Sequence, residues 1–260
     1  MSKIKTNLEK FQDFKRMNKV AREKKAVREG YPDASAYMAV LKEQAEGKTT
    51  TKKAKIVTAL PVVHIVDVLD RSGSMSGSRI SSAIKGINSG IESLKKDTTI
   101  DYIYTVCQFD NVIHFPLRKE KISKVGKQNF VARGSTSLYD AIGQTIELIN
   151  SDLEKDAKVL VNIYTDGGEN SSTRYSAKTI AKLIKEYSEK GFTFTFIGTK
   201  RDTDYVVRDL NIDESNTLVY DGSGKGLEKA LVETASARTS YTTKLKAGED
   251  VTRGFYKSIK

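Results

Sequence analysis

The sequence predicts an α/β fold, in which a mostly parallel sheet carries helices on both faces and one antiparallel strand at its edge. Strand-length apolar runs alternate with amphipathic segments of helix length along most of the chain. Asp110-Asn111 separates two further strand-length runs as a tight hairpin would, which predicts the antiparallel edge strand. At 260 residues the chain is long enough for one such domain with an additional segment.

Residues 1–47 are expected to form a basic helical extension. Between Thr6 and about Glu29 apolar residues recur every three positions in a polar segment, which predicts an amphipathic helix. Thr6 and Glu9 have the spacing of a capping box. The recurring apolar residues are Leu8, Phe11, Phe14, Met17 and Val20. A second helix is predicted at 34–46, with Gly47 as its stop. Residues 48–55, rich in Thr and Lys, are predicted to be a linker.

The main domain is expected at residues 56–238. Its first predicted strand, 62–69, is an apolar run interrupted by Asp67, whose carboxylate needs a hydrogen-bond partner if the strand is buried. The helix that follows has one apolar face, formed by Ile80, Ala83, Ile84, Ile87, Ile91 and Leu94. The other predicted strands are 100–109, 112–117, 159–165, 192–198 and 218–220, and the other predicted helices are 138–153, 177–187 and 227–235. Residues 239–260 are expected to be a polar basic tail without assigned structure.

The formal net charge of +11 is concentrated in the first part of the chain. Residues 1–60 contain 15 Lys or Arg and 7 Asp or Glu, a surplus of 8 positive charges. Such a segment suits an acidic protein surface, nucleic acid or anionic lipid, and charge alone does not choose among them. The apolar stripe of Phe11, Phe14 and Met17 favours docking to protein, so the N-terminal helices are a candidate second partner contact. Nucleic acid is not favoured, and its binding would be weak and strongly salt-dependent.

Cysteine use and hydropathy bear on the compartment. Cys107 is the only cysteine, which excludes an internal disulfide and fits a reducing environment. The first eight residues carry frequent charges and no apolar stretch, so we expect no signal peptide. The longest apolar runs are of strand length, so we expect no membrane span. A cytoplasmic location follows as a prediction.

Side-chain oxygens gather at the ends of the predicted strands. Asp70, Ser72 and Ser74 come directly after the first apolar run. Thr136 opens a predicted helix, and Asp166 follows another strand. In open α/β sheets, ligands bind outside the carboxyl ends of the strands. Hydroxyls and carboxylates suit Mg²⁺ or Mn²⁺ and disfavour zinc, which prefers Cys and His. The sequence therefore predicts a site for a hard divalent cation.

At these five residues the chain resembles the von Willebrand factor A (VWA) family. The metal-ion-dependent adhesion site of that family has the pattern Asp-x-Ser-x-Ser with a distant Thr and a distant Asp, and all five positions match. The resemblance covers roughly residues 56–238 and implies a Rossmann-like VWA fold. It also implies that Ser72, Ser74 and Thr136 are direct ligands of the ion, whereas Asp70 and Asp166 act largely through water.

The resemblance implies a binding function. We expect a divalent-cation-dependent protein–protein interaction module, in which an Asp or Glu of a partner protein completes the coordination of Mg²⁺ or Mn²⁺. No catalytic residue is predicted, and we expect no enzymatic activity. Many animal VWA domains are secreted or lie on cell surfaces, so the predicted cytoplasmic location indicates, by elimination, a bacterial or viral protein.

Two alternatives stay open. The first is a metal-assisted hydrolase in which the ion activates water and Glu169 acts as the base, although no His or carboxylate pair is placed for it. The second is a nucleic-acid-associated structural protein that acts through the basic extension. Asp140 and Asn170 are expected to support the site without being ligands.

Overall fold

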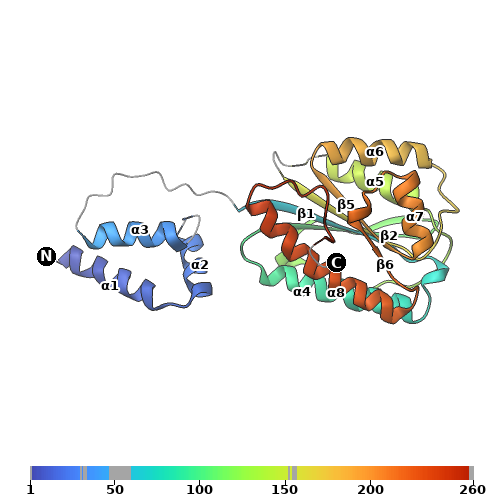
Figure 1. Cartoon of the computed structure of the whole chain (residues 1–260). Coiled ribbons are helices and arrows are strands. Elements are labelled where there is room, and N and C mark those ends of the chain that lie inside the picture. Colours follow the sequence, from blue (N-terminus) through green and yellow to red (C-terminus); the bar gives the residue numbers. More distant parts are fainter. Residues whose placement is uncertain are drawn as a thin grey trace. The chain divides into compact units, whose positions relative to one another are not determined.

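Two compact units, Met1–Leu60 and Pro61–Lys260, make up the chain. Figure 1 shows the computed structural model, which describes residues 2–29, 31, 34–46, 60–151, 153 and 157–257. The predicted linker at 48–55, the helix stop at Gly47 and the expected domain start at residue 56 lie outside the described residues.

The described residues of the first unit form helices α1 (Ser2–Arg16), α2 (Lys19–Arg28) and α3 (Ala34–Ala45). The single helix expected from Thr6 to about Glu29 is therefore wrong, because the chain begins helix α1 earlier and breaks between α1 and α2. Asn18 explains the break: its Oδ1 accepts a hydrogen bond from the N–H of Ala21 at 2.9 Å, which caps a new helix. The second predicted helix is confirmed as α3.

The apolar stripe of the first unit packs largely within the unit. Phe14 is fully buried, and its ring lies edge-on to Tyr37 of α3 with 4.9 Å between the ring centroids. Phe11 and Met17 pack against the same cluster. The other buried members of this cluster are Ala26 and Leu41. Most of the residues that the sequence offers for docking therefore form the unit's own core.

The second unit is built on a six-stranded sheet in the order β3-β2-β1-β4-β5-β6. The strands are β1 (Val62–Asp70), β2 (Asp101–Phe109), β3 (Ile113–Lys121), β4 (Lys158–Tyr164), β5 (Phe192–Gly198) and β6 (Thr217–Val219). Five strands run parallel, and β3 pairs antiparallel with β2 at the edge. The predicted fold class is confirmed.

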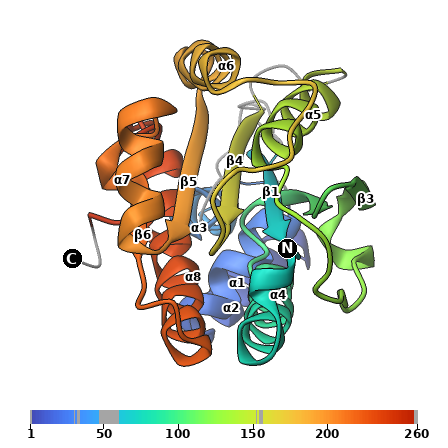
Figure 2. The ribbon, with the colours of Figure 1, turned by 90° about the vertical axis from the view of Figure 1, so that its right-hand side faces the viewer.

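Helices cover both faces of this sheet, and Figure 2 shows the two layers from the end at which the parallel strands finish. The helices are α4 (Ser78–Lys96), α5 (Leu138–Asn150), α6 (Ala177–Glu189), α7 (Lys200–Asp209) and α8 (Gly224–Lys246). Buried residues of α4 and α8 form one core cluster with the sheet. Buried residues of α5, α6 and α7 form a second cluster on the other face, which contains Cys107.

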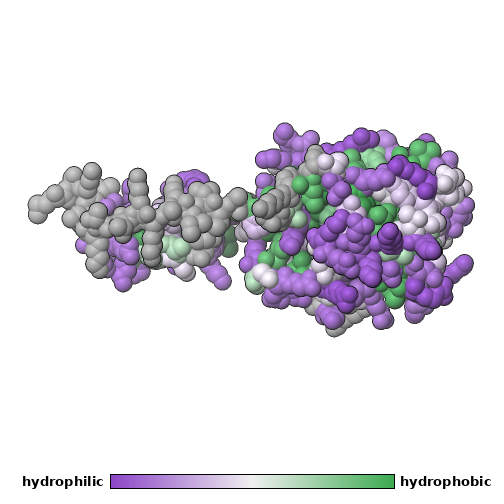
Figure 3. Space-filling view, turned by 90° about the horizontal axis from the view of Figure 1, so that it is seen from above, coloured by the Kyte–Doolittle hydropathy of each residue, from purple (hydrophilic) through white to green (hydrophobic). Residues whose placement is uncertain are grey.

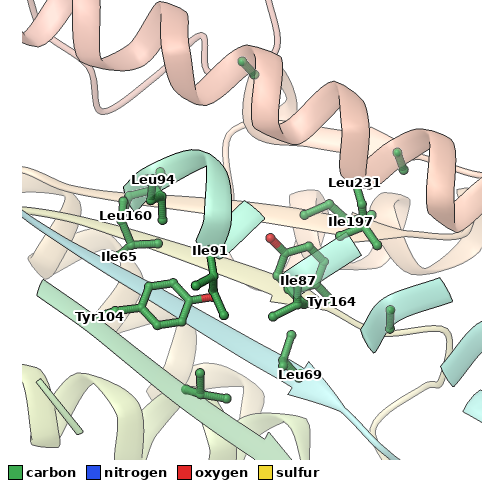
Figure 4. Packing of buried hydrophobic residues seen from close by; sticks show 14 of the residues in the cluster. Ile65, Leu69, Ile87, Ile91, Leu94, Tyr104, Leu160, Tyr164, Ile197 and Leu231 are labelled. Carbon is green, nitrogen blue, oxygen red and sulfur yellow. The ribbon is translucent and has the colours of Figure 1, made fainter. Parts of the chain in front are cut away.

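The face covered by α4 and α8 contains a glycine contact between the two helices. A Cβ atom at Gly86 of α4 would lie only 2.3 Å from Cδ1 of Leu231 in α8, so glycine allows the two helices to approach closely. Figure 4 shows Leu231 next to Ile197, and Ile87 next to Tyr164, in this layer. Tyr104 and Tyr164 carry their hydroxyl groups into the same layer.

The C-terminal part of the chain differs from its expected form. Helix α8 runs from Gly224 to Lys246 and passes through the boundary expected at residue 238. Tyr241, Val251, Phe255 and Tyr256 are buried in the same cluster as α4. The chain up to Tyr256 thus completes the core of the second unit and is not a separate polar tail, because its few large apolar residues all face inward. Helix α7 has no counterpart among the predicted elements.

Candidate metal centre

Asp70 and Asp166 lie at the point where the strand order of the sheet reverses. β1 pairs on one side with β2 and on the other with β4, so the connections that leave these strands diverge at their carboxyl ends. Asp70 is the last residue of β1, and Asp166 comes two residues after the end of β4. The topology therefore brings the two carboxylates to one crevice, at the end of the sheet that Figure 2 shows.

All five residues of the predicted site form one connected cluster. Oγ of Ser74 donates a hydrogen bond to Oδ1 of Asp166 at 2.6 Å and lies 3.0 Å from Oγ of Ser72. A Cβ atom placed on Gly167 would lie 3.0 Å from Oγ1 of Thr136, 3.3 Å from Oγ of Ser74 and 3.5 Å from Oδ2 of Asp70. Oxygens from two separate segments thus lie close to one point on the loop after β4. Ser74 is exposed while Asp70, Ser72 and Thr136 are buried, so the cluster opens to solvent beside Ser74.

Asp70 is held by its neighbours on both oxygens. The backbone N–H of Ser72 donates to Oδ1 of Asp70 at 2.6 Å, and Oγ1 of Thr165 donates to Oδ2. The hydroxyl of Thr165 also accepts the N–H of Gly167 at 3.0 Å, which ties the loop after β4 to the end of β1. Sequence reasoning missed Thr165, although a hydroxyl directly before Asp166 at a strand end is a signal that could have found it.

Asn170 positions Thr136. Its Oδ1 accepts the backbone N–H of Thr136 at 3.0 Å, and its own N–H donates to the carbonyl of Thr136 at 3.0 Å. Asp140 acts farther out, since its carboxylate accepts the N–H groups of residues 173–175 and anchors that loop to the start of α5. Neither residue is among the oxygens that surround Gly167.

The carboxylate of Glu169 is occupied by the protein. It accepts the backbone N–H groups of Tyr139, Ser171 and Ser172 at 2.7 to 2.9 Å and the hydroxyl of Ser172 at 2.7 Å. A carboxylate that already accepts four hydrogen bonds is a poor general base, because these bonds occupy its oxygens and fix its position. Glu169 is therefore a loop anchor at the start of α5.

The two carboxylates of the cluster, Asp70 and Asp166, differ in their hydrogen bonding. Oδ2 of Asp166 is buried without a hydrogen bond, and the charged group close to it is Nε of Arg79 at 3.0 Å. Burial raises the pKa of Asp70 to about 6, although hydrogen bonds from Thr165 and Ser72 oppose this rise. Two buried carboxylates in one crevice favour a cation between them. Sequence reasoning missed Arg79, which is the second residue of α4 and belongs to no recognisable motif.

The donor set fits a hard divalent cation. The oxygens of Thr136, Ser74 and Asp70 lie around the Cβ position of Gly167, and Ser74 links them to Ser72 and Asp166. Oδ2 of Asp166 has no hydrogen bond. Such oxygen donors suit Mg²⁺ or Mn²⁺. Within the described residues, no three His, Cys, Asp or Glu side chains are grouped to hold a metal, so a zinc-type centre finds no support there.

The family model of the von Willebrand factor type A domain matches residues 64–233. The chain belongs to this family. The match begins in β1 and ends in α8, so it includes every segment that contributes an oxygen to the cluster. VWA domains bind protein partners and are in general not enzymes, so membership supports a protein-interaction module. No helix among the described residues of this VWA protein is long and apolar enough to cross a membrane.

Solved structures with the same fold include three proteins of bacterial pili. The pilus adhesin SpaC from Lactobacillus rhamnosus GG has a TM-score of 0.55 and 14% identity, over 68% of this chain and 30% of the adhesin. The minor pilin PilB from Streptococcus sanguinis has a TM-score of 0.51 and 12% identity, over 68% of this chain and 61% of the pilin. The matched regions are thus less than two thirds of either protein.

The third is the von Willebrand factor domain of the type V pili tip protein Mfa5 from Porphyromonas gingivalis, with a TM-score of 0.50 and 13% identity. It is matched over 69% of this chain and 95% of that domain. At such identities the likeness shows the fold alone. No curated protein sequence matches the chain.

Proposed function

We propose that this VWA domain captures a partner protein through a bound divalent cation, Mg²⁺ or Mn²⁺. The observation that carries the proposal is the convergence of Thr136, Ser74 and Asp70 oxygens around the Cβ position of Gly167. In this proposal Ser72, Ser74 and Thr136 hold the ion directly, and Asp70 and Asp166 hold it through water. The bound ion supplies an electrophilic position that accepts a carboxylate oxygen from an Asp or Glu of the partner.

The protein's own residues favour such a ligand. The hydroxyls of Ser72, Ser74 and Thr136 are neutral, so the charge of the ion is balanced only by two carboxylates that also need water to reach it. An incoming carboxylate therefore gains a strong charge-assisted contact. The exposed side of the cluster, at Ser74, is the side from which a partner can reach it.

The surface of the second unit supports recognition by charge. Its large exposed apolar residues are dispersed over different segments: Val112, Val131, Val219 and Val232. Figure 3 shows a largely hydrophilic face with smaller hydrophobic areas between the polar ones. A binding mode that depends on one charged contact through a metal is compatible with such a surface, whereas a broad apolar interface needs a contiguous patch.

A cation titration of two neighbouring variants tests the proposal. We expect the wild-type chain to bind one Mn²⁺ or Mg²⁺, measured by calorimetry and by Mn²⁺ paramagnetic resonance. Thr136→Ala should abolish this binding. Ser137→Ala is the matched control, because the hydroxyl of Ser137 contacts Oγ of Ser171 at 2.9 Å and not the oxygen cluster. Equal cation binding by both variants would contradict the assignment of Thr136.

Capture of partner proteins tests whether the bound cation mediates the contact with a partner. The same chains are used as bait in Mg²⁺ and again in chelator, with the captured proteins identified by mass spectrometry. We expect partners that need both Mg²⁺ and Thr136, and a carboxylate-bearing peptide from such a partner should lose binding when its Asp or Glu becomes Asn or Gln. Undiminished capture in chelator would exclude a metal-mediated contact.

A further inference from the structure

Arg238 of α8 is a buried cation whose Nε has no hydrogen-bond partner. Only 7% of the residue is exposed, and its Nε lies in the interior without a hydrogen-bond partner. Within the described part of the chain, no carboxylate forms an ion pair with its guanidinium group. An arginine has five N–H donors and does not lose its charge in proteins. Leaving such a group unpaired in the interior is costly, so the position needs an explanation.

Asp67 of β1 is the nearby buried carboxylate, but its oxygens are taken by other donors. Nδ2 of Asn162 donates to Oδ1 at 2.8 Å, and the hydroxyls of Tyr104 and Tyr164 also donate to the carboxylate. Burial by itself lowers the pKa of Arg238, yet the charge of Asp67 and the neighbouring tyrosines outweigh it and raise the pKa. Asp67 therefore partly balances the charge of Arg238 without accepting its hydrogen bonds.

Arg238 lines a cavity of about 240 Å³ between α4 and α8. A Cβ atom at Gly90 of α4 would lie 3.5 Å from Nη1 of Arg238, so the guanidinium faces a part of α4 that has no side chain. The remaining lining is rich in hydroxyl groups and includes a second cation. These residues are Ser93, Thr99, Thr239, Thr242, Thr243 and Lys246. The volume is several times the roughly 30 Å³ that one water molecule occupies in the liquid.

Asp97 also lines this Arg238 cavity, but it does not pair with Arg238. Its Oδ1 accepts the N–H and the hydroxyl of Thr99 at 2.9 and 2.6 Å, and its Oδ2 accepts the hydroxyl of Tyr102 at 2.7 Å. Burial raises the pKa of Asp97, but these hydrogen bonds and the charge of Lys246 together lower it. Lys246 donates to Oγ1 of Thr99 at the rim. The cavity thus offers two cations and several hydroxyls beside one carboxylate, whose charge Lys246 partly offsets.

The cavity lies far along the sheet from the candidate metal centre. Tyr102 is the second residue of β2 and pairs with Val63 near the start of β1, whereas Asp70 ends β1 opposite Phe109. The two sites therefore lie at opposite ends of the parallel strands. A ligand in the Arg238 cavity needs no residue of the metal centre.

We propose that the Arg238 cavity binds a small tetrahedral oxyanion of the phosphate type. The several acceptor oxygens of such an ion match the guanidinium of Arg238 and the hydroxyls of the lining, and Lys246 adds a second positive charge at the rim. Arginine suits this task because its planar group presents donors in a fixed fork.

A phosphate titration of the full chain in chelator tests the site without the metal centre. Inorganic phosphate should raise the melting temperature saturably at constant ionic strength and shift the Nε–H resonance of Arg238 and the amides of residues 93–99 and 239–246. Arg238→Gln should weaken phosphate binding about tenfold or more, because it removes a charge-assisted hydrogen-bond donor.

Two lysine variants of α8 test the proposal if Arg238→Gln does not fold. Lys246→Gln should weaken phosphate binding about two- to fivefold, as expected for a partly solvated charge. Lys229→Gln is the matched control, since Lys229 lies on the same helix, pairs with Glu233 and does not line the cavity. The proposal is overturned if wild type shows no saturable response, if Arg238→Gln responds like wild type, or if the two lysine variants respond alike.

Discussion

Arg79 lies at the edge of the oxygen cluster, where its Nε is 3.0 Å from Oδ2 of Asp166 and its Nη1 donates to the carbonyl of Gly222 at 3.3 Å. Its side chain is 34% exposed, so water screens part of its charge. A divalent cation near Asp166 would meet this guanidinium as a like charge. Arg79 therefore balances Asp166 when no cation is bound and opposes the cation when one arrives.

Arg79→Gln should therefore tighten cation binding. The expected gain is about two- to fivefold in affinity for Mg²⁺ or Mn²⁺, because a partly exposed charge contributes only modestly. Calorimetric titration at low ionic strength measures it. Arg174→Gln is the control, since Arg174 pairs with Glu147 away from the cluster at 2.8 Å. Weaker binding by Arg79→Gln would mean that Arg79 is needed to hold Asp166 in place.

The sequence predicted the five residues of the cluster and the support from Asn170, but not Thr165 or Arg79. Asp70, Ser72 and Ser74 could be predicted because they lie close together in the sequence. Thr136 and Asp166 could be predicted because they lie at the ends of predicted elements and complete the same pattern. Thr165 and Arg79 belong to no pattern, and only the pairing of β1 with β4 brings Thr165 to Asp70. That Thr136 and Asp166 reach the same point is likewise a product of topology.

At the scale of elements, the packing of α8 on α4 depends on Gly86. A methyl group there would overlap Leu231, with 2.3 Å between the Cβ position and Cδ1. Gly86→Ala should destabilise the second unit by about 1–3 kcal/mol, the usual cost of overpacking a core. Chemical denaturation followed by far-UV circular dichroism measures the change.

Two further variants make the Gly86 result specific. Gly90→Ala meets Nη1 of Arg238 at 3.5 Å, an ordinary contact, so it should change the free energy of unfolding little. Leu231→Ala destabilises the wild-type chain by opening a cavity, but in the Gly86→Ala background it should cost less, because it also removes the overlap. Additive effects of the two substitutions would show that they do not act through this contact.

Most elements of the second unit could be predicted because their apolar periodicity is strong. Helix α7 was missed because it contains few apolar residues, although Thr199 and Asp202 form a capping box that signals its start. Helix α8 was predicted too short because its later turns contain threonines. The hydroxyl of Thr242 donates to the carbonyl of Thr239 at 3.0 Å, which lets a polar residue be buried in these turns.

At the scale of the whole molecule, the chain has separate cores and an uneven charge. The buried residues of α1 to α3 form one cluster, and none of them belongs to the two clusters that flank the sheet. The surplus of 8 positive charges in residues 1–60 therefore belongs to a unit with its own core. A second partner contact through these helices stays a prediction, and so does the cytoplasmic location.

Separate cores predict separate loss of structure. Phe14 is fully buried against Tyr37, and Phe14→Ala should destabilise the first unit by about 3–5 kcal/mol. Because the chain has no tryptophan, hydrogen exchange with mass spectrometry is the suitable measurement. Amides of residues 2–29 and 34–45 should lose protection, while those of the sheet keep it. Leu8→Ala, at a residue 47% exposed in the same unit, should change little. Loss of protection in β1 and β4 as well would contradict this prediction. It would mean that the two units unfold cooperatively.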